Sequence, residues 1–128
     1  MVNAESKIGQ FRYESETWKR NLEFIMEENA NLKNRLAEVL KSEVADEDIL
    51  NTAEQYQNDF IREDETISLL RSDIADLDKL LIREVFEDGH LIQDVVRRQK
   101  KMSVEMKNAI TGFNKLKFDF NNYLGEVL

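Results

Sequence analysis

Apolar residues recur at alternating steps of three and four along the last third of the chain, from Ile92 to Val127. Ten of the eleven positions on this seam are apolar, and the exception is Gln99. A heptad pattern held over five repeats is typical of a long helix packed lengthwise against other helices. It predicts a helix over about residues 91–127. The seam positions are Ile92, Val95, Gln99, Met102, Met106, Ala109, Phe113, Leu116, Phe120, Tyr123 and Val127.

Two earlier segments carry seams with the same spacing. Residues 8–41 predict a first helix with eight of ten seam positions apolar, and residues 47–87 predict a second with nine of eleven. Over the three seams 27 of 32 positions are apolar, whereas the hydrophobic fraction of 41% would give about 13 by chance. The chain also contains no proline to interrupt a helix.

Short breaks are predicted near residues 42–47 and 88–90. Asp46 is a suitable N-cap for the second helix, and Gly89 is a suitable left-handed C-cap at its end. A single glycine costs only about 1 kcal/mol inside a helix, so one continuous rod through Gly89 is the alternative. The preferred interpretation is one all-α domain over residues 1–128, an elongated, coiled-coil-like antiparallel three-helix bundle.

The antiparallel arrangement predicts which residues lie at the same height. Turns near residues 44 and 89 set Trp18 level with Leu70, and Tyr56 level with Tyr123. In shape such a bundle resembles a spectrin-type repeat, which also has a tryptophan in its first helix. The resemblance is one of architecture, and it implies no function.

Glu63 occupies a seam position, where a carboxylate must be paired, neutralised or extended to water. It is predicted to lie near Asn29 and Lys117. We interpret these three residues as a polar layer that fixes the alignment of the helices. A buried ligand site or switch at Glu63 is the alternative.

Several large apolar residues fall outside the seams, at positions that a monomeric bundle exposes to water. Phe24, Ile61 and Phe118 are predicted to lie at a similar height. Such a group indicates a partner surface, and the partner expected is a second copy or another helical protein. Scattered, unrelated surface residues are the alternative. The candidate interface residues are Phe24, Ile61, Ile82, Phe86 and Phe118, with Val104 at a further exposed position.

Catalytic chemistry has little support in the composition. The chain has one histidine and no cysteine, so no Ser–His or Cys–His pair is indicated, and no enzyme activity, cofactor or small-molecule substrate is expected. Glu87 and His90 have the Glu-x-x-His spacing of di-iron carboxylate bundles. Those sites need two such motifs, so a metal-binding bundle is an alternative that requires a dimer.

The charge is unevenly distributed. The net charge is −8, with residues 42–88 at −11 and residues 89–128 at +3. The acidic balance argues against nucleic acid as a partner, although the basic run Arg97–Lys101 keeps binding of nucleic acid or an anionic surface as a further alternative. No apolar run approaches the ~20 residues that span a bilayer, and no signal peptide is evident, so a cytoplasmic protein is expected.

Overall fold

A computed structural model describes the backbone of residues 4–42, 46–86 and 92–128, and the side chains of residues 8–42, 46–82 and 93–128. Three helices account for nearly all of these ranges: α1 (Ala4–Leu40), α2 (Glu47–Phe86) and α3 (Ile92–Val127). No strand occurs within these ranges. The predicted all-α architecture is confirmed, and α1 begins four residues earlier than its seam indicated.

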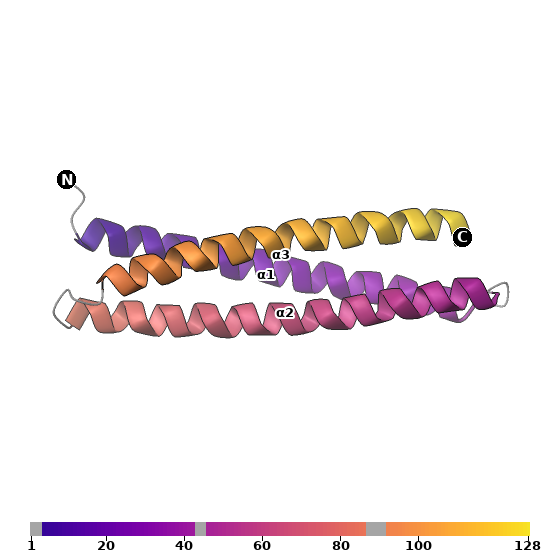
Figure 1. Cartoon of the computed structure of the whole chain (residues 1–128), viewed down its shortest axis with the longest axis horizontal. Coiled ribbons are helices and arrows are strands. Elements are labelled where there is room, and N and C mark those ends of the chain that lie inside the picture. Colours follow the sequence, from indigo (N-terminus) through magenta and orange to yellow (C-terminus); the bar gives the residue numbers. More distant parts are fainter. Residues whose placement is uncertain (1–3, 43–45, 87–91) are drawn as a thin grey trace.

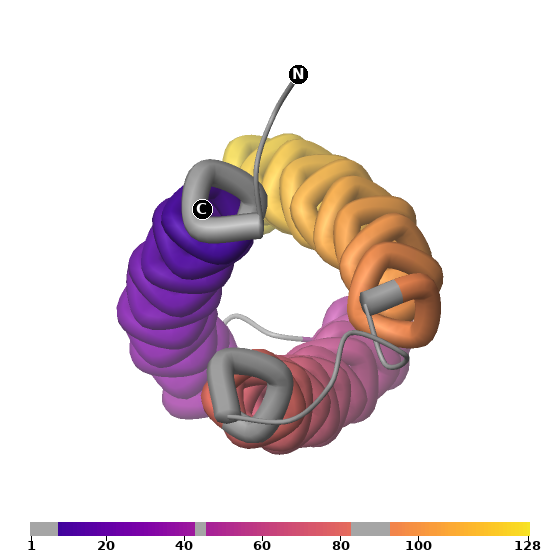
Figure 2. Tube along the Cα trace, turned by 90° about the vertical axis from the view of Figure 1, so that its left-hand side faces the viewer, coloured from indigo at the N-terminus to yellow at the C-terminus, as the bar shows by residue number. Residues whose placement is uncertain are grey.

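The helices form an elongated bundle in which α2 runs antiparallel to α1 and α3 (Figure 1). Seen along the bundle, the three helices stand around a common axis (Figure 2), and each contacts the other two. Since α2 and α3 lie side by side, a continuous helix through Gly89 is wrong. The C-cap predicted at Gly89 lies outside the described residues.

The core consists mainly of the seam residues, which are positions a and d of the heptads, with Leu124 buried beside them at an e position. Heptad spacing turns these two positions inward on every helix, so three apolar rows meet along the axis. Burial of one such side chain contributes about 1.5–3 kcal/mol. The largest apolar side chains with almost no solvent exposure are Leu22, Phe60, Ile74, Met106, Phe113 and Phe120.

The start of α2 has the predicted cap. The backbone N–H of Ile49 donates a hydrogen bond to Asp46 Oδ1 at 2.8 Å. Glu47 and Asp48 occupy the first turn, where negative charge interacts favourably with the helix dipole. Asp46 therefore fixes where the second helix begins.

An aromatic cluster joins the beginning of α2 to the end of α3. The ring centroids of Tyr56 and Tyr123 are 5.1 Å apart, as their predicted common height requires. Phe60 and Phe120 meet edge to face at 4.9 Å. The hydroxyl of Tyr123 donates a hydrogen bond to the carbonyl of Ile49 at 2.8 Å. These contacts fix the alignment of α2 with α3.

Candidate interaction surfaces and polar contacts between the helices

A buried amide on α1 binds a carboxylate on α2. The side chain of Asn29 has no solvent exposure, and its Nδ2 donates hydrogen bonds to the carbonyl of Phe60 at 3.1 Å and to Asp64 Oδ1 at 2.9 Å. Lys33, one turn further along α1, forms an ion pair with the other oxygen of Asp64. Asp64 thus accepts a hydrogen bond from Asn29 and pairs with Lys33, which lie on successive turns of α1.

The same arrangement recurs two heptads away. The hydroxyl of Ser15 donates to Asp78 Oδ1 at 2.6 Å, and Lys19 Nζ lies 2.7 Å from Asp78 Oδ2. The hydrogen bond from Lys19 to Asp78 raises the pKa of the Lys19 ammonium. We call these two sets, Asn29–Lys33–Asp64 and Ser15–Lys19–Asp78, the aspartate clamps.

Arg71 lies midway between the two clamp aspartates, seven residues from each. Its guanidinium contacts the sulfur of Met26, which lies midway between the clamp lysines. A slip of α1 by one heptad in either direction would place Arg71 opposite Lys19 or Lys33. Like charges in that position are destabilising, so the order of charges selects one register.

The predicted polar layer differs in its contacts. Asn29 binds Asp64 rather than Glu63, and Lys117 Nζ pairs with Glu28 on α1 at 2.5 Å. Glu63 is half-buried and makes no hydrogen bond or ion pair within the described residues. Burial, and secondarily the charge of Asp64, raise the pKa of the Glu63 carboxyl. The residue that sequence reasoning missed is Asp64, at the e position next to Glu63.

Every candidate interface residue with a described side chain is exposed. Phe24 is 59% exposed and Phe118 is 66% exposed, while the side chain of Phe86 lies outside the described residues. Tyr13 and Leu69, which were not predicted, are exposed by 68% and 67%. Their f and c heptad positions were the signal that could have identified them. The other exposed large apolar side chains are Ile61, Ile82, Val104, Leu128 and, at e positions beside the core, Met26, Leu40 and Leu50.

These side chains do not gather in one patch. In a three-helix bundle, positions b and c point over the two flanks of a helix, and position f points directly outward. Ile61 and Ile82, at b of α2, therefore lie on the side formed by α1 and α2. Phe24, at c of α1, lies on the side formed by α1 and α3. Leu69, at c of α2, lies on the side formed by α2 and α3.

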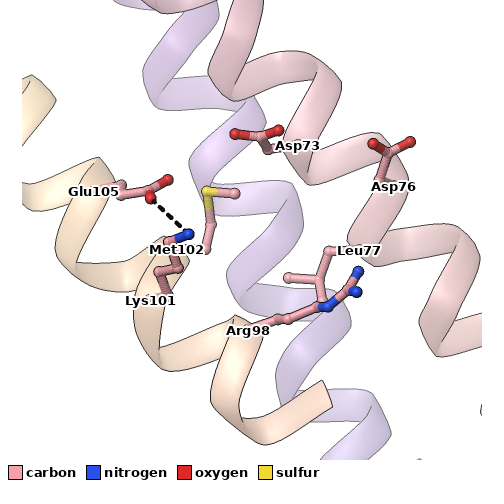
Figure 3. A pocket seen from close by; sticks show the side chains of 7 residues that line it. All are labelled: Asp73, Asp76, Leu77, Arg98, Lys101, Met102 and Glu105. Atoms are coloured by element: carbon pink, nitrogen blue, oxygen red, sulfur yellow. Dashed lines mark ion pairs between the residues drawn. The ribbon is translucent and has the colours of Figure 1, made fainter. Parts of the chain in front are cut away.

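A hollow of about 300 Å³ lies between α2 and α3 (Figure 3). Asp73 and Asp76 line it from α2, and Arg98 and Lys101 line it from α3. Lys101 forms a loose ion pair with Glu105 on its own helix at 3.9 Å. No ion pair in the described ranges joins the two walls. The remaining lining residues are Glu105, Leu77 and Met102.

The basic run Arg97–Lys101 lies partly at this hollow and partly in solvent. Arg97 forms an ion pair with Asp94, one turn earlier on α3, at 3.5 Å. Arg98 and Lys101 share the hollow with Asp76. Asp78 lies on the other flank of α2 and binds α1.

Metal binding has no observed support in the part of the chain that is described. No three His, Asp or Glu side chains there are arranged to hold a metal ion, and Glu87 and His90 lie outside it. Across the same residues, no helix has the length and apolar character needed to cross a membrane. No family model, curated protein or solved structure compared with the chain matches it.

Proposed function

We propose that this chain is a non-enzymatic protein–protein interaction or scaffold module that associates with itself through exposed apolar helical residues. The observation that supports this is the number of large apolar side chains on the outside of a bundle whose core is already filled. Phe118 alone exposes two-thirds of its surface. A partner would remove these apolar groups from water, and aromatic residues are enriched in the buried centres of interfaces. The proposal retains the cytoplasmic location expected from the sequence.

The mass of the protein in solution tests this function. Sedimentation equilibrium over a range of concentrations should show a species heavier than the 15.1 kDa monomer. Phe118→Glu should shift that species to the monomer and leave helicity by circular dichroism unchanged, because the side chain contributes nothing to the core. A monomer at every concentration of the unmodified chain would contradict the proposal.

Asn31→Glu is a matched control. Asn31 is an exposed polar residue of α1, and the change adds one negative charge, as Phe118→Glu does. Its mass should equal that of the unmodified chain. Dissociation by Asn31→Glu as well would show that added charge, rather than loss of the Phe118 surface, separates the subunits.

A further inference from the structure

Charged side chains join the helices on two sides of the bundle but not on the third. The aspartate clamps connect α1 to α2, and Lys117–Glu28 connects α1 to α3. Between α2 and α3, in the described residues, no ion pair between side chains is formed. The acidic wall of Asp73 and Asp76 and the basic wall of Arg98 and Lys101 are both exposed to solvent. Their charges do not pair with one another across the hollow. We call the surface formed by these four residues and Leu69 the α2–α3 side.

Internal pairing does not explain these charges. Asp73 and Glu105 occupy corresponding g positions on the two helices, and both are acidic. Two like charges at the closest approach of α2 and α3 oppose the packing slightly. Arg98 and Lys101 are both exposed, so a second molecule can reach them.

The arrangement is self-complementary. A rotation of 180° about a line along the groove between α2 and α3 exchanges the two walls at the same height. The acidic wall of one copy then meets the basic wall of the other, twice in each dimer. Two-fold symmetry of this kind is the commonest in soluble oligomers, and it requires such an exchange of unlike patches.

An apolar contact fits the same symmetry. The contacts of Phe60 with Phe120 and the shared hollow of Leu77 and Met102 place Leu69 level with residues near 110 on α3. Gly112 lies there in mid-helix, and a Cβ added to it would meet nothing within 4 Å. Glycine costs about 1 kcal/mol relative to alanine in this position, without any steric need inside the chain. In a dimer, the exposed Leu69 of the second copy would pack against Gly112.

We propose that the α2–α3 side binds a second copy of this chain in a parallel dimer, with the two-fold axis along the groove. Asp76 of each copy pairs with Lys101 of the other, and Leu69 of each packs at Gly112 of the other. Phe118 and Val104, at outward f positions of α3, lie at the rim of this contact. The proposal rests on the self-association proposed above and specifies its surface and geometry.

Exchange of charges between two chains tests this geometry. Asp76→Lys alone and Lys101→Glu alone should each weaken dimerisation about tenfold or more, because each puts like charges at both symmetric contacts. An equimolar mixture of the two variants should recover nearly the unmodified dissociation constant, since a heterodimer has unlike charges at both. Glu23→Lys, an exposed change on the side formed by α1 and α2, should leave the dissociation constant unchanged.

The outcomes separate this proposal from the broader one. A monomeric unmodified chain overturns self-association itself. An unmodified oligomer that both variants leave intact overturns only the α2–α3 side as its surface. Weakening by each variant without recovery in the mixture overturns the parallel two-fold geometry. Circular dichroism of each variant confirms that the helices are retained, which the exposure of both positions leads us to expect.

Discussion

Asn29 Nδ2 lies 2.9 Å from Asp64 Oδ1, although 35 residues separate the two in sequence. The amide is fully buried, and the carboxylate reaches it from the edge of the interface between α1 and α2. Asn29 Oδ1 is buried without a hydrogen-bond partner among the described residues. The pair therefore carries a cost in stability, and it gives α1 one preferred height against α2.

Removing the acceptor of this pair should destabilise the fold. Asp64→Ala leaves one buried N–H of Asn29 without a partner and separates Lys33 from its ion pair. We expect a loss of about 1–3 kcal/mol in the free energy of unfolding by urea denaturation. Asp73→Ala, on the α2–α3 side with no ion pair in the described residues, should change it by less than about 0.5 kcal/mol. Equal losses of stability in Asp64→Ala and Asp73→Ala would show that Asp64 acts through its negative charge alone and not through its contact with Asn29.

The second clamp predicts an energetic coupling between Ser15 and Asp78. Ser15→Ala, Asp78→Ala and the double variant form a cycle whose coupling energy isolates their 2.6 Å hydrogen bond. We expect a coupling of about 1–2 kcal/mol, because Ser15 is buried and the acceptor is charged. A cycle of Ser15 with Asp76, which lies on the other flank of α2, should give no coupling. Strict additivity of Ser15 and Asp78 would refute the contact.

Glu63 should make the stability fall as pH rises. Its pKa in the folded protein is raised above the ordinary value of 4.5 by burial and then by Asp64. The folded state therefore holds the proton more tightly than the unfolded chain does. Stability is fully present below about 4.5 and is lost as pH rises through the raised pKa. Glu63→Gln should remove this contribution of Glu63 to the pH dependence of stability. The measurement is the free energy of unfolding at successive pH values.

At neutral pH the same reasoning predicts that Glu63→Leu stabilises the bundle. The substitution removes a half-buried charge that has no partner in the described residues and adds apolar surface at a seam position. We expect a gain of about 1 kcal/mol and a higher melting temperature. A lower melting temperature would indicate that Glu63 has a stabilising role.

Tyr123→Phe should weaken the junction of α2 and α3. The hydroxyl hydrogen bond to the Ile49 carbonyl is lost, while the ring contacts with Tyr56 and Phe120 remain. The expected loss is about 1 kcal/mol in thermal or urea unfolding. Tyr13→Phe, at an exposed position of α1, should have no measurable effect.

The heptad pattern predicted the three helices because burial at positions a and d requires only local spacing. Asp46 was predictable for the same reason, since a cap depends on neighbouring residues. The alignment of α2 with α3 was also correct, as the contact of Tyr56 with Tyr123 shows.

The height of α1 against α2 was less accurate. Trp18 was placed level with Leu70, but Ser15 and Lys19 on either side of it both bind Asp78, about two turns further along α2. The prediction paired residues that are equally far in sequence from the midpoint of the segment between α1 and α2. That assumption ignores any advance of the chain along the bundle axis before α2 begins.

The seam pattern also did not predict which polar residues bind one another. Glu63 and Asp64 are neighbours, and only the rotation of α2 about its axis decides which carboxylate meets Asn29. The sides of the bundle on which Phe24, Ile61 and Phe118 lie depend on the same rotation.

An odd number of helices gives this molecule a direction. α1 begins at one end of the bundle and α3 finishes at the other (Figure 1), so Ala4 and Leu128 are separated by most of its length. A tension applied between those two residues acts parallel to the helices. It loads the packed rows in shear, all of them together, instead of peeling the helices apart one contact at a time. Resistance to stretching therefore depends on the same interlocked side chains, with the aspartate clamps opposing any sliding of α1 along α2.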